Sequence, residues 1–242
     1  MSSRRRRSLA AATLAMVLLA GCAPRPDTGP AADAPSGGEA LPPAWVTEPG
    51  TPYALDPARS AISVRVYRAG RLAHLGHNHL VEVRGLRGAL RRLNGGGGLA
   101  QLGFRVDEMR VDDPAARALA GSDFAQTPDA AAVTGTRANM LGEKVLNAAR
   151  WPEIQVSARI ADLAAAQPLA DIQVSLHGVG RRYQTPVRIQ ASPGRLSVTG
   201  SLFLRQSDFG MAPFSVLGGA LQVRDAIEVD FRVVGRNSDD PM

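Results

Sequence analysis

Apolar and polar residues alternate along most of the chain beyond residue 60, and a period of two is typical of β-strands. Ile62, Val64 and Val66 share one face of such a strand, while polar residues occupy the positions between them. The same period recurs in about eight segments, at 61–67, 80–84, 101–111, 154–160, 172–177, 187–189, 196–204 and 227–233. The chain is therefore predicted to be all-β.

One stretch between the third and fourth segments has helical character instead. Asp113 and Pro114 form an N-cap and first-turn pair, which predicts a short helix over 115–120, and a second helix is expected over 142–149. Closing one-sided strands into a barrel removes exposed sheet edges. We expect an antiparallel β-barrel of about eight strands with a short helical crossover insert.

The interior of such a barrel holds either a packed core or space for one small apolar ligand. Aromatic residues make up only 5% of the chain, so the inner wall should be mainly aliphatic. The pattern leaves both a filled and a hollow barrel open. The inward-facing residues that would contact a ligand, and that would otherwise form ordinary core, are Val64, Val66, Leu102, Phe104, Val174, Val198, Leu202, Val229 and Phe231.

The N-terminal segment has the pattern of an export signal, with a basic start and an apolar run that is short for a membrane span. Leu19-Ala20-Gly21-Cys22 resembles the lipobox of bacterial lipoproteins. Cys22 is the only cysteine, so we expect an acyl anchor there; the alternative is cleavage elsewhere and a soluble protein. Ala23 replaces the aspartate of inner-membrane retention, which favours a periplasmic protein anchored to the outer membrane.

The sequence divides into four parts: a signal peptide at 1–21, a flexible tether at 22–50, a barrel domain at 51–236 and a short tail at 237–242. Pro, Ala and Gly dominate the tether, which has no apolar face to bury. Removing Arg4 to Arg7 with the signal lowers the net charge from +6 to +2. The remaining arginines alternate with acids, so nucleic-acid binding is not expected.

Sequence motifs of catalysis are missing. The glycine run 95–98 lacks the lysine of a phosphate-binding loop and is interpreted as a hairpin connection. Asp208-Phe209-Gly210 occurs without the other kinase motifs, and no Gly-x-Ser-x-Gly nucleophile elbow is present. We therefore expect neither enzyme activity nor a cofactor, and we expect Asp208-Phe209-Gly210 to end a strand.

Three of the four histidines lie in one turn, at His74, His77 and His79. Imidazole is a common ligand of zinc, copper and nickel, so a metal-binding or metal-delivery protein is one alternative. The turn contains no carboxylate or cysteine to complete a site. A structural role at the barrel rim and contact with a ligand headgroup are the other two interpretations. His177 is expected to be a surface or rim residue.

Several segments match a known family in their order along the chain. They are Tyr53-Ala54-Leu55-Asp56, Leu75-Gly76-His77-Asn78-His79, Lys144-Val145-Leu146-Asn147 with Trp151-Pro152-Glu153-Ile154, Val174-Ser175-Leu176-His177-Gly178-Val179, and Arg205-Gln206-Ser207-Asp208-Phe209-Gly210 with Leu217-Gly218-Gly219-Ala220-Leu221. In these segments the chain resembles YceI-like proteins, over residues 53 to about 236.

The resemblance implies a lipocalin-like antiparallel barrel that holds a long polyisoprenoid or similar lipid, in an exported bacterial protein without catalytic activity. It favours the hollow barrel over the filled one, which would be a structural or stress-response module. The histidine-rich turn places the chain in a branch whose ligand the resemblance does not name. The expected function is sequestration or transport of an isoprenoid-like lipid.

Overall fold

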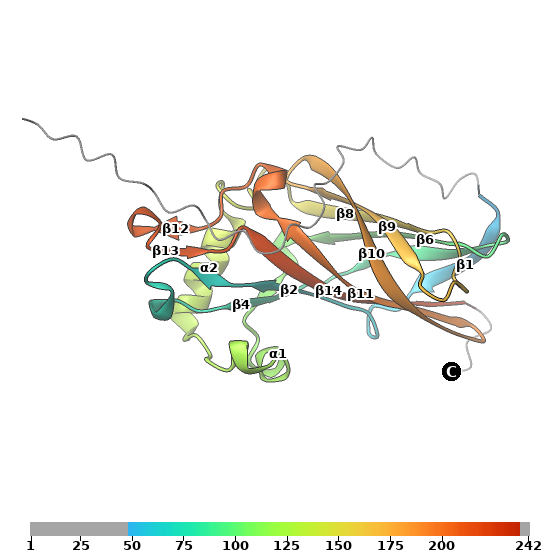
Figure 1. Cartoon of the computed structure of the whole chain (residues 1–242), viewed down its shortest axis with the longest axis horizontal. Helices are drawn as coiled ribbons and strands as arrows, with labels where there is room; N and C mark the ends of the chain where they lie inside the picture. Colours follow the sequence, from blue (N-terminus) through green and yellow to red (C-terminus); the bar gives the residue numbers. More distant parts are fainter. Residues whose placement is uncertain (1–47, 238–242) are drawn as a thin grey trace, which may run out of the picture.

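The computed structural model describes residues 48–237 and has an elongated β-barrel as its main body (Figure 1). Eight antiparallel strands follow one another around the barrel, and pairing of the first with the last closes it. In spatial order they are β1 (Gly50–Leu55), β5 (Arg87–Leu93), β6 (Gly98–Arg105), β8 (Glu153–Ile160), β9 (Leu169–Leu176), β10 (Val179–Ser192), β11 (Arg195–Arg205) and β14 (Ala226–Arg236). The predicted all-β barrel is confirmed.

One edge of β14 pairs with β11, and its other edge is shared by two strands, β1 and β2 (Ala61–Val66). Its C-terminal end pairs with β1, through Ala54 opposite Arg236 and Leu55 opposite Gly235. Its N-terminal half pairs instead with β2, which continues the sheet through β4 (His79–Glu82) to β7 (Arg110–Val111). The barrel wall is thereby extended at one end.

A small second sheet projects at that same end of the molecule (Figure 1). It contains β12 (Ser215–Val216), β13 (Leu221–Val223) and β3 (Arg68–Ala69), with β13 in the centre. Five short 3-10 helices complete the described chain: η1 (Ala73–Leu75), η2 (Val106–Glu108), η3 (Ser122–Phe124), η4 (Gln206–Phe209) and η5 (Leu217–Gly219).

The helical insert differs in part from the prediction. α1 (Pro114–Leu119) lies where expected, and the Asp113 carboxylate accepts hydrogen bonds from the N–H groups of Ala115 and Ala116. The helix expected over 142–149 is wrong: this stretch is a series of turns, with Asn147 at a φ of 45° that a helix does not accept. The second helix is α2 (Ala130–Leu141).

The glycine run connects β5 to β6, as predicted. Asp208-Phe209-Gly210 was expected to end a strand, but β11 already ends at Arg205 and the motif forms the end of η4, where Gly210 turns the chain with a left-handed φ of 73°. In the part of the chain that the structure describes, no helix is both long and apolar enough to cross a membrane.

Candidate functional site

An apolar cavity of about 200 Å³ runs inside the barrel. Its wall is built from residues of β2, β4, β5, β6, β8, β9, β11 and β14, because alternate residues of each strand point inward. Gln206 is the only polar side chain among the residues that line it. The cavity therefore offers a ligand almost nothing but hydrocarbon contacts.

All nine residues that alternation placed on the inner wall line this cavity: Val64, Val66, Leu102, Phe104, Val174, Val198, Leu202, Val229 and Phe231. They come from strands far apart in the sequence, and the closed barrel brings them around one space. Their role in holding a ligand stays a prediction.

The wall faces open space and is not fully packed. Val156, Ala158 and Val198 point inward, yet each keeps intermediate solvent exposure, as residues facing a hollow do. Ala100 and Ala158 lie opposite each other on β6 and β8, and two such short side chains leave the middle of the wall thin. The filled barrel, one of the two readings that the pattern left open, does not describe this interior.

One end of the cavity is covered by residues that strand alternation could not identify. Met140 of α2 and the turn residues Val145 and Leu146 line the cavity from the helical insert, and Met211 lines it from the loop after η4. Gln206 belongs to the same cover; its side-chain Nε2 donates to the Arg224 carbonyl at 2.9 Å, which fixes the amide. Val145 and Leu146 belong to the stretch that was expected to be a helix, and they reach the cavity from turns instead.

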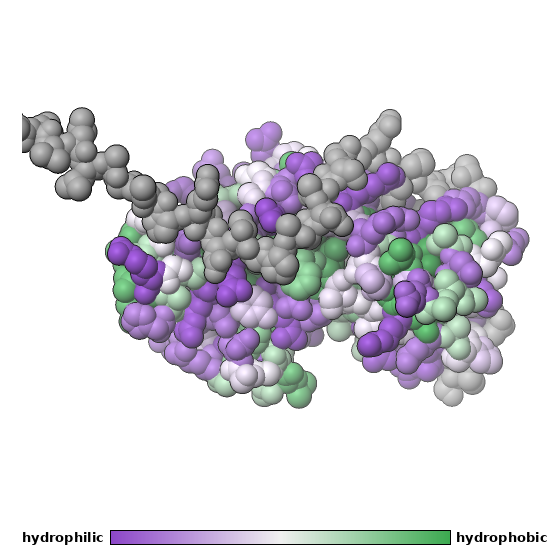
Figure 2. Space-filling model, viewed as in Figure 1, coloured by the Kyte–Doolittle hydropathy of each residue, from purple (hydrophilic) through white to green (hydrophobic). Residues whose placement is uncertain are grey.

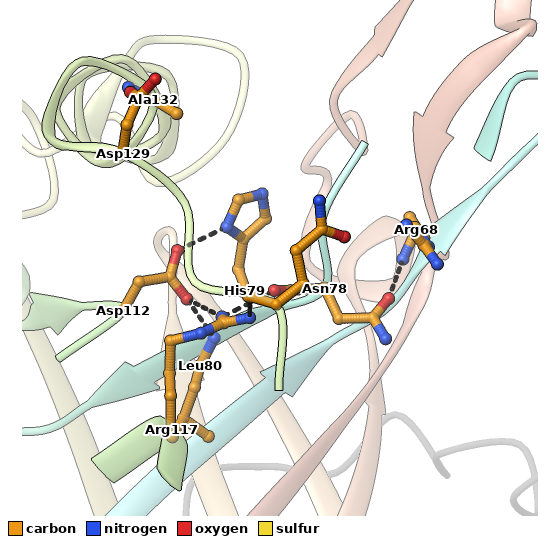
Figure 3. Close-up of polar contacts among 9 residues, drawn as sticks. Arg68, Asn78, His79, Leu80, Asp112, Arg117, Asp129 and Ala132 are labelled. Atoms are coloured by element: carbon orange, nitrogen blue, oxygen red, sulfur yellow. Dashed lines mark hydrogen bonds and ion pairs between the residues drawn. The ribbon is translucent and has the colours of Figure 1, made fainter. Parts of the chain in front are cut away.

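The histidine-rich turn is held by a buried carboxylate, as Figure 3 shows. His79 Nδ1 lies 2.6 Å from Asp112 Oδ2, and the Leu80 N–H donates to Asp112 Oδ1 at 2.9 Å. The Arg117 guanidinium donates to the same Oδ1 at 2.5 Å and to the Asn78 carbonyl at 2.8 Å. Together these bonds attach the start of β4 to α1.

The charge of Asp112 is strongly affected by its position. Burial, the largest effect, opposes ionisation, but the hydrogen bonds from His79 and Leu80 and the electrostatic attraction of His79 and the Arg117 guanidinium outweigh it. The pKa of Asp112 therefore lies below its ordinary value. Asp112 and Arg117 form an ion pair with side chains 0% and 2% exposed, so the pair is shielded from solvent screening.

The other turn residues point to a structural role. Asn78 Oδ1 accepts from the Arg68 N–H at 3.0 Å (Figure 3), and Asn78 Nδ2 donates to the Asp123 carbonyl at 2.9 Å. Each bond ties the turn to another segment of the rim. These contacts are what an asparagine in a rim turn provides.

The three histidines do not converge on one point. The rings of His77 and His79 have centroids 6.3 Å apart, and His74 is exposed in η1. Among residues 48–237, no three His, Cys, Asp or Glu side chains are close enough together to hold a metal ion. The geometry gives no support to the metal-binding alternative.

His177 lies in the tight β9–β10 turn, with a φ of 53°. Its Nδ1 is 2.9 Å from the Phe209 carbonyl, so this nitrogen carries the proton that is donated to η4. Gly178 follows with a φ of +74°, and a Cβ there would lie 2.5 Å from the Trp151 ring. His177 thus joins two rim segments and lies about 100 residues along the chain from the histidine-rich turn.

The proposed lipidation site, Cys22, lies outside the described residues.

Comparison with known proteins identifies the family. Among solved structures, BcnA of Burkholderia cenocepacia has a TM-score of 0.55 and 14% identity, covering 74% of this chain and 98% of its own. The YceI protein of Campylobacter jejuni has a TM-score of 0.48 and 8% identity, covering 65% and 84%. A search of curated proteins found no match. The model of the YceI-like domain matches residues 53–235, and the chain therefore belongs to the YceI-like domain family.

Proposed function

We propose that this protein is an exported lipoprotein that binds a long apolar lipid, polyisoprenoid-like in character, inside its barrel. Cys22 would carry the acyl anchor, on the periplasmic side of the outer membrane, and the bound lipid would be sequestered or transported. The observation that carries the proposal is the apolar wall of the cavity, which is interrupted by one polar side chain.

The chemistry of the wall selects for hydrocarbon. Each Å² of apolar ligand surface that leaves water for this wall contributes about 25 cal/mol. A charged or strongly polar ligand would lose its hydration and find only Gln206 as a partner, whose amide is already engaged. We therefore propose that burial of apolar ligand surface drives binding and that no catalytic step is involved.

The size of the cavity sets what enters it. An engineered apolar cavity of roughly 150 Å³ is known to accept benzene, so the space of about 200 Å³ accepts a short hydrocarbon segment. A longer tail requires either outward movement of the wall or extension of the tail past the cover formed by Met140, Leu146 and Met211. The helical insert is therefore proposed to determine how much of the ligand is enclosed.

The test is extraction of the purified protein with organic solvent and identification of released lipid by mass spectrometry. Ala158→Phe places a ring in the cavity, whereas Gln155→Phe places the same ring on the outer face of the same strand. We expect an apolar lipid to be recovered from the native protein and from Gln155→Phe, with a large loss from Ala158→Phe. Equal recovery from both variants, or no lipid from the native protein, would refute binding inside the barrel.

A further inference from the structure

Exposed apolar side chains gather at the projecting small sheet, which we call the distal tip and define as residues 68–77 and 212–224. Four of the seven large hydrophobic residues that are exposed in the described chain lie here, namely Leu75, Phe214, Val216 and Leu217. Leu75 and Leu217 are 63% and 71% exposed. Figure 2 shows hydrophobic residues at this end of the molecule, where Figure 1 places β12 and β13.

The two segments of the distal tip form one surface. The Leu72 N–H donates to the Ala220 carbonyl at 2.8 Å, which joins η1 to the loop before β13. Leu221 lies opposite Val216 in the β12–β13 register, and a Cβ at Gly76 would be 2.9 Å from Leu221 Cδ1. The residue after Leu75 therefore packs against the strand that pairs with β12. Contiguous exposed apolar surface of this kind marks a site of interaction.

The charge of the distal tip has one sign. Arg68, Arg71 and Arg224 lie within its two segments, which contain no aspartate or glutamate. Arg71 and Arg224 are exposed, and the Arg224 guanidinium lies over the Tyr67 ring, 5.5 Å from its centroid. Apolar side chains surrounded by arginine are the combination that binds the boundary of an anionic lipid bilayer.

The distal tip also adjoins the lipid cavity. Val66, which lines the cavity, is followed by Tyr67 and the tip residue Arg68, and Met211, which also lines it, directly precedes the tip residue Ala212. The Ala212 N–H donates to the Lys144 carbonyl at 2.9 Å, next to the cavity residue Val145. A bilayer in contact with the distal tip would therefore lie beside the covered end of the cavity.

We propose that the distal tip docks this protein on the surface of an anionic lipid bilayer, with Leu75 and Leu217 entering the interfacial region. This inference rests on the proposed function, since docking at this end would bring the cavity to the membrane from which an apolar lipid is taken or to which it is delivered. The occupant of the apolar surface is thus a lipid bilayer, not a second copy of the chain.

The chain allows a clean test because its single cysteine can be replaced. In full-length protein carrying Cys22→Ser, an environment-sensitive fluorophore is attached at Leu75→Cys, at Leu217→Cys or, as a control, at Gly95→Cys in the β5–β6 turn at the other end of the barrel. A reporter at each position reads only its own surroundings, so the remaining N-terminal segment does not confuse the result. Vesicles of phosphatidylglycerol are compared with vesicles of phosphatidylcholine.

We expect a blue shift and brighter emission from both tip positions with phosphatidylglycerol, and no change at Gly95→Cys. Arg71→Gln should weaken vesicle partitioning about fivefold, as expected for one arginine near an anionic surface. Unchanged emission at both tip positions would overturn the proposal, as would equal insertion into phosphatidylcholine. A shift that appears without vesicles and grows with protein concentration would indicate self-association and would also overturn it.

The same labelled proteins separate this inference from lipid carriage. Solvent extraction of the Leu217→Cys protein measures lipid in the barrel, and fluorescence measures insertion of the distal tip. An empty extract with clear insertion would remove the carriage proposal and leave docking intact, whereas a loaded barrel without insertion would do the reverse.

Discussion

Replacement of Arg117 by methionine tests whether the buried ion pair holds the histidine-rich turn. Arg117→Met removes three bonds, to Asp112 Oδ1 and to the carbonyls of Asn78 and Gln126. Methionine keeps a long apolar side chain, so the main change is electrostatic. Asp112 then stays buried with only His79 and the Leu80 N–H to stabilise its charge.

The expected loss of unfolding free energy follows from the burial of the Asp112–Arg117 ion pair. Removing one partner of a buried pair costs about 3–5 kcal/mol, because the remaining charge is uncompensated. The bonds from His79 and Leu80 stay in place, so we expect about 3 kcal/mol, near the lower limit. For a domain of this size that corresponds to a decrease in Tm of about 6–12 °C.

Urea unfolding at neutral pH followed by circular dichroism measures this free energy. Arg110→Met is the matched control, because Arg110 pairs with Asp113 in a solvent-exposed bridge with an arginine side chain 58% exposed. That control should leave the unfolding midpoint unchanged. The double variant Arg117→Met, Asp112→Asn removes the stranded charge and should be more stable than Arg117→Met alone.

The pH dependence gives a second check. Because the folded-state pKa of Asp112 is lowered, its ionisation contributes stability above the unfolded-state pKa and loses that contribution as pH falls through the folded-state pKa. The native and Arg117→Met proteins should therefore differ most near neutral pH, and the difference should shrink as the pH falls below the ordinary aspartate range and through the lowered folded-state pKa of Asp112. A destabilisation below 1 kcal/mol at neutral pH, or additive effects in the double variant, would refute the role of the pair.

Three further changes test separate features of the fold. Gly178→Ala should lower the unfolding free energy by about 1–3 kcal/mol, because Gly178 has a positive φ and a Cβ there would meet the Trp151 ring. Gly95→Ala is the control and should leave the unfolding free energy unchanged, because the space around Gly95 is open. Urea unfolding midpoints measure both variants. Phe124→Ala should cost about 3–5 kcal/mol by calorimetry, since the ring is 1% exposed, and a cost under 1 kcal/mol would contradict its place in the core. Burial raises the pKa of Tyr183 well above that of a free phenol, so ultraviolet titration should show one phenol that ionises after the other two, and Tyr183→Phe should abolish that last step.

Strand alternation predicts the barrel and its inner wall well, because each inward residue of a strand is specified by its local period. The wall from Val64 to Phe231 follows this rule. Closure of the barrel cannot be predicted from a single strand, because it depends on the pairing of β1 with β14. It was expected only because exposed edges of a β-sheet are unfavourable.

The helical insert was harder to predict. None of the residues of α2 is buried, so no apolar stripe in the sequence marks this helix. Its only local signals are Asp129, whose side chain accepts a hydrogen bond from the Ala132 N–H as an N-cap, and the run of alanines that follows. The stretch 142–149 contains the apolar pair Val145 and Leu146, but Asn147 takes a left-handed conformation that ends any helix there. The stretch therefore forms turns, with both apolar residues at the cavity.

The partner of the histidine-rich turn was not identifiable from sequence. Asp113 was assigned correctly as the N-cap of α1, but the residue before it, Asp112, received no role, because nothing in the local sequence connects it with His79. Only the pairing of β4 with β7, which sets Val81 opposite Val111, brings the carboxylate to the imidazole. Contacts of this kind depend on how distant strands pair in the folded protein, and the local sequence does not specify that pairing.

The pairing of β1 with β14 has a consequence during synthesis. Residues 54 and 55 find their partners only at residues 235 and 236, so a nascent chain still on the ribosome cannot complete the ring until its final strand has emerged. Contacts between such distant residues also form slowly. A product that ends ahead of β14 would therefore leave β1, β2 and β11 as open edges that are prone to aggregation.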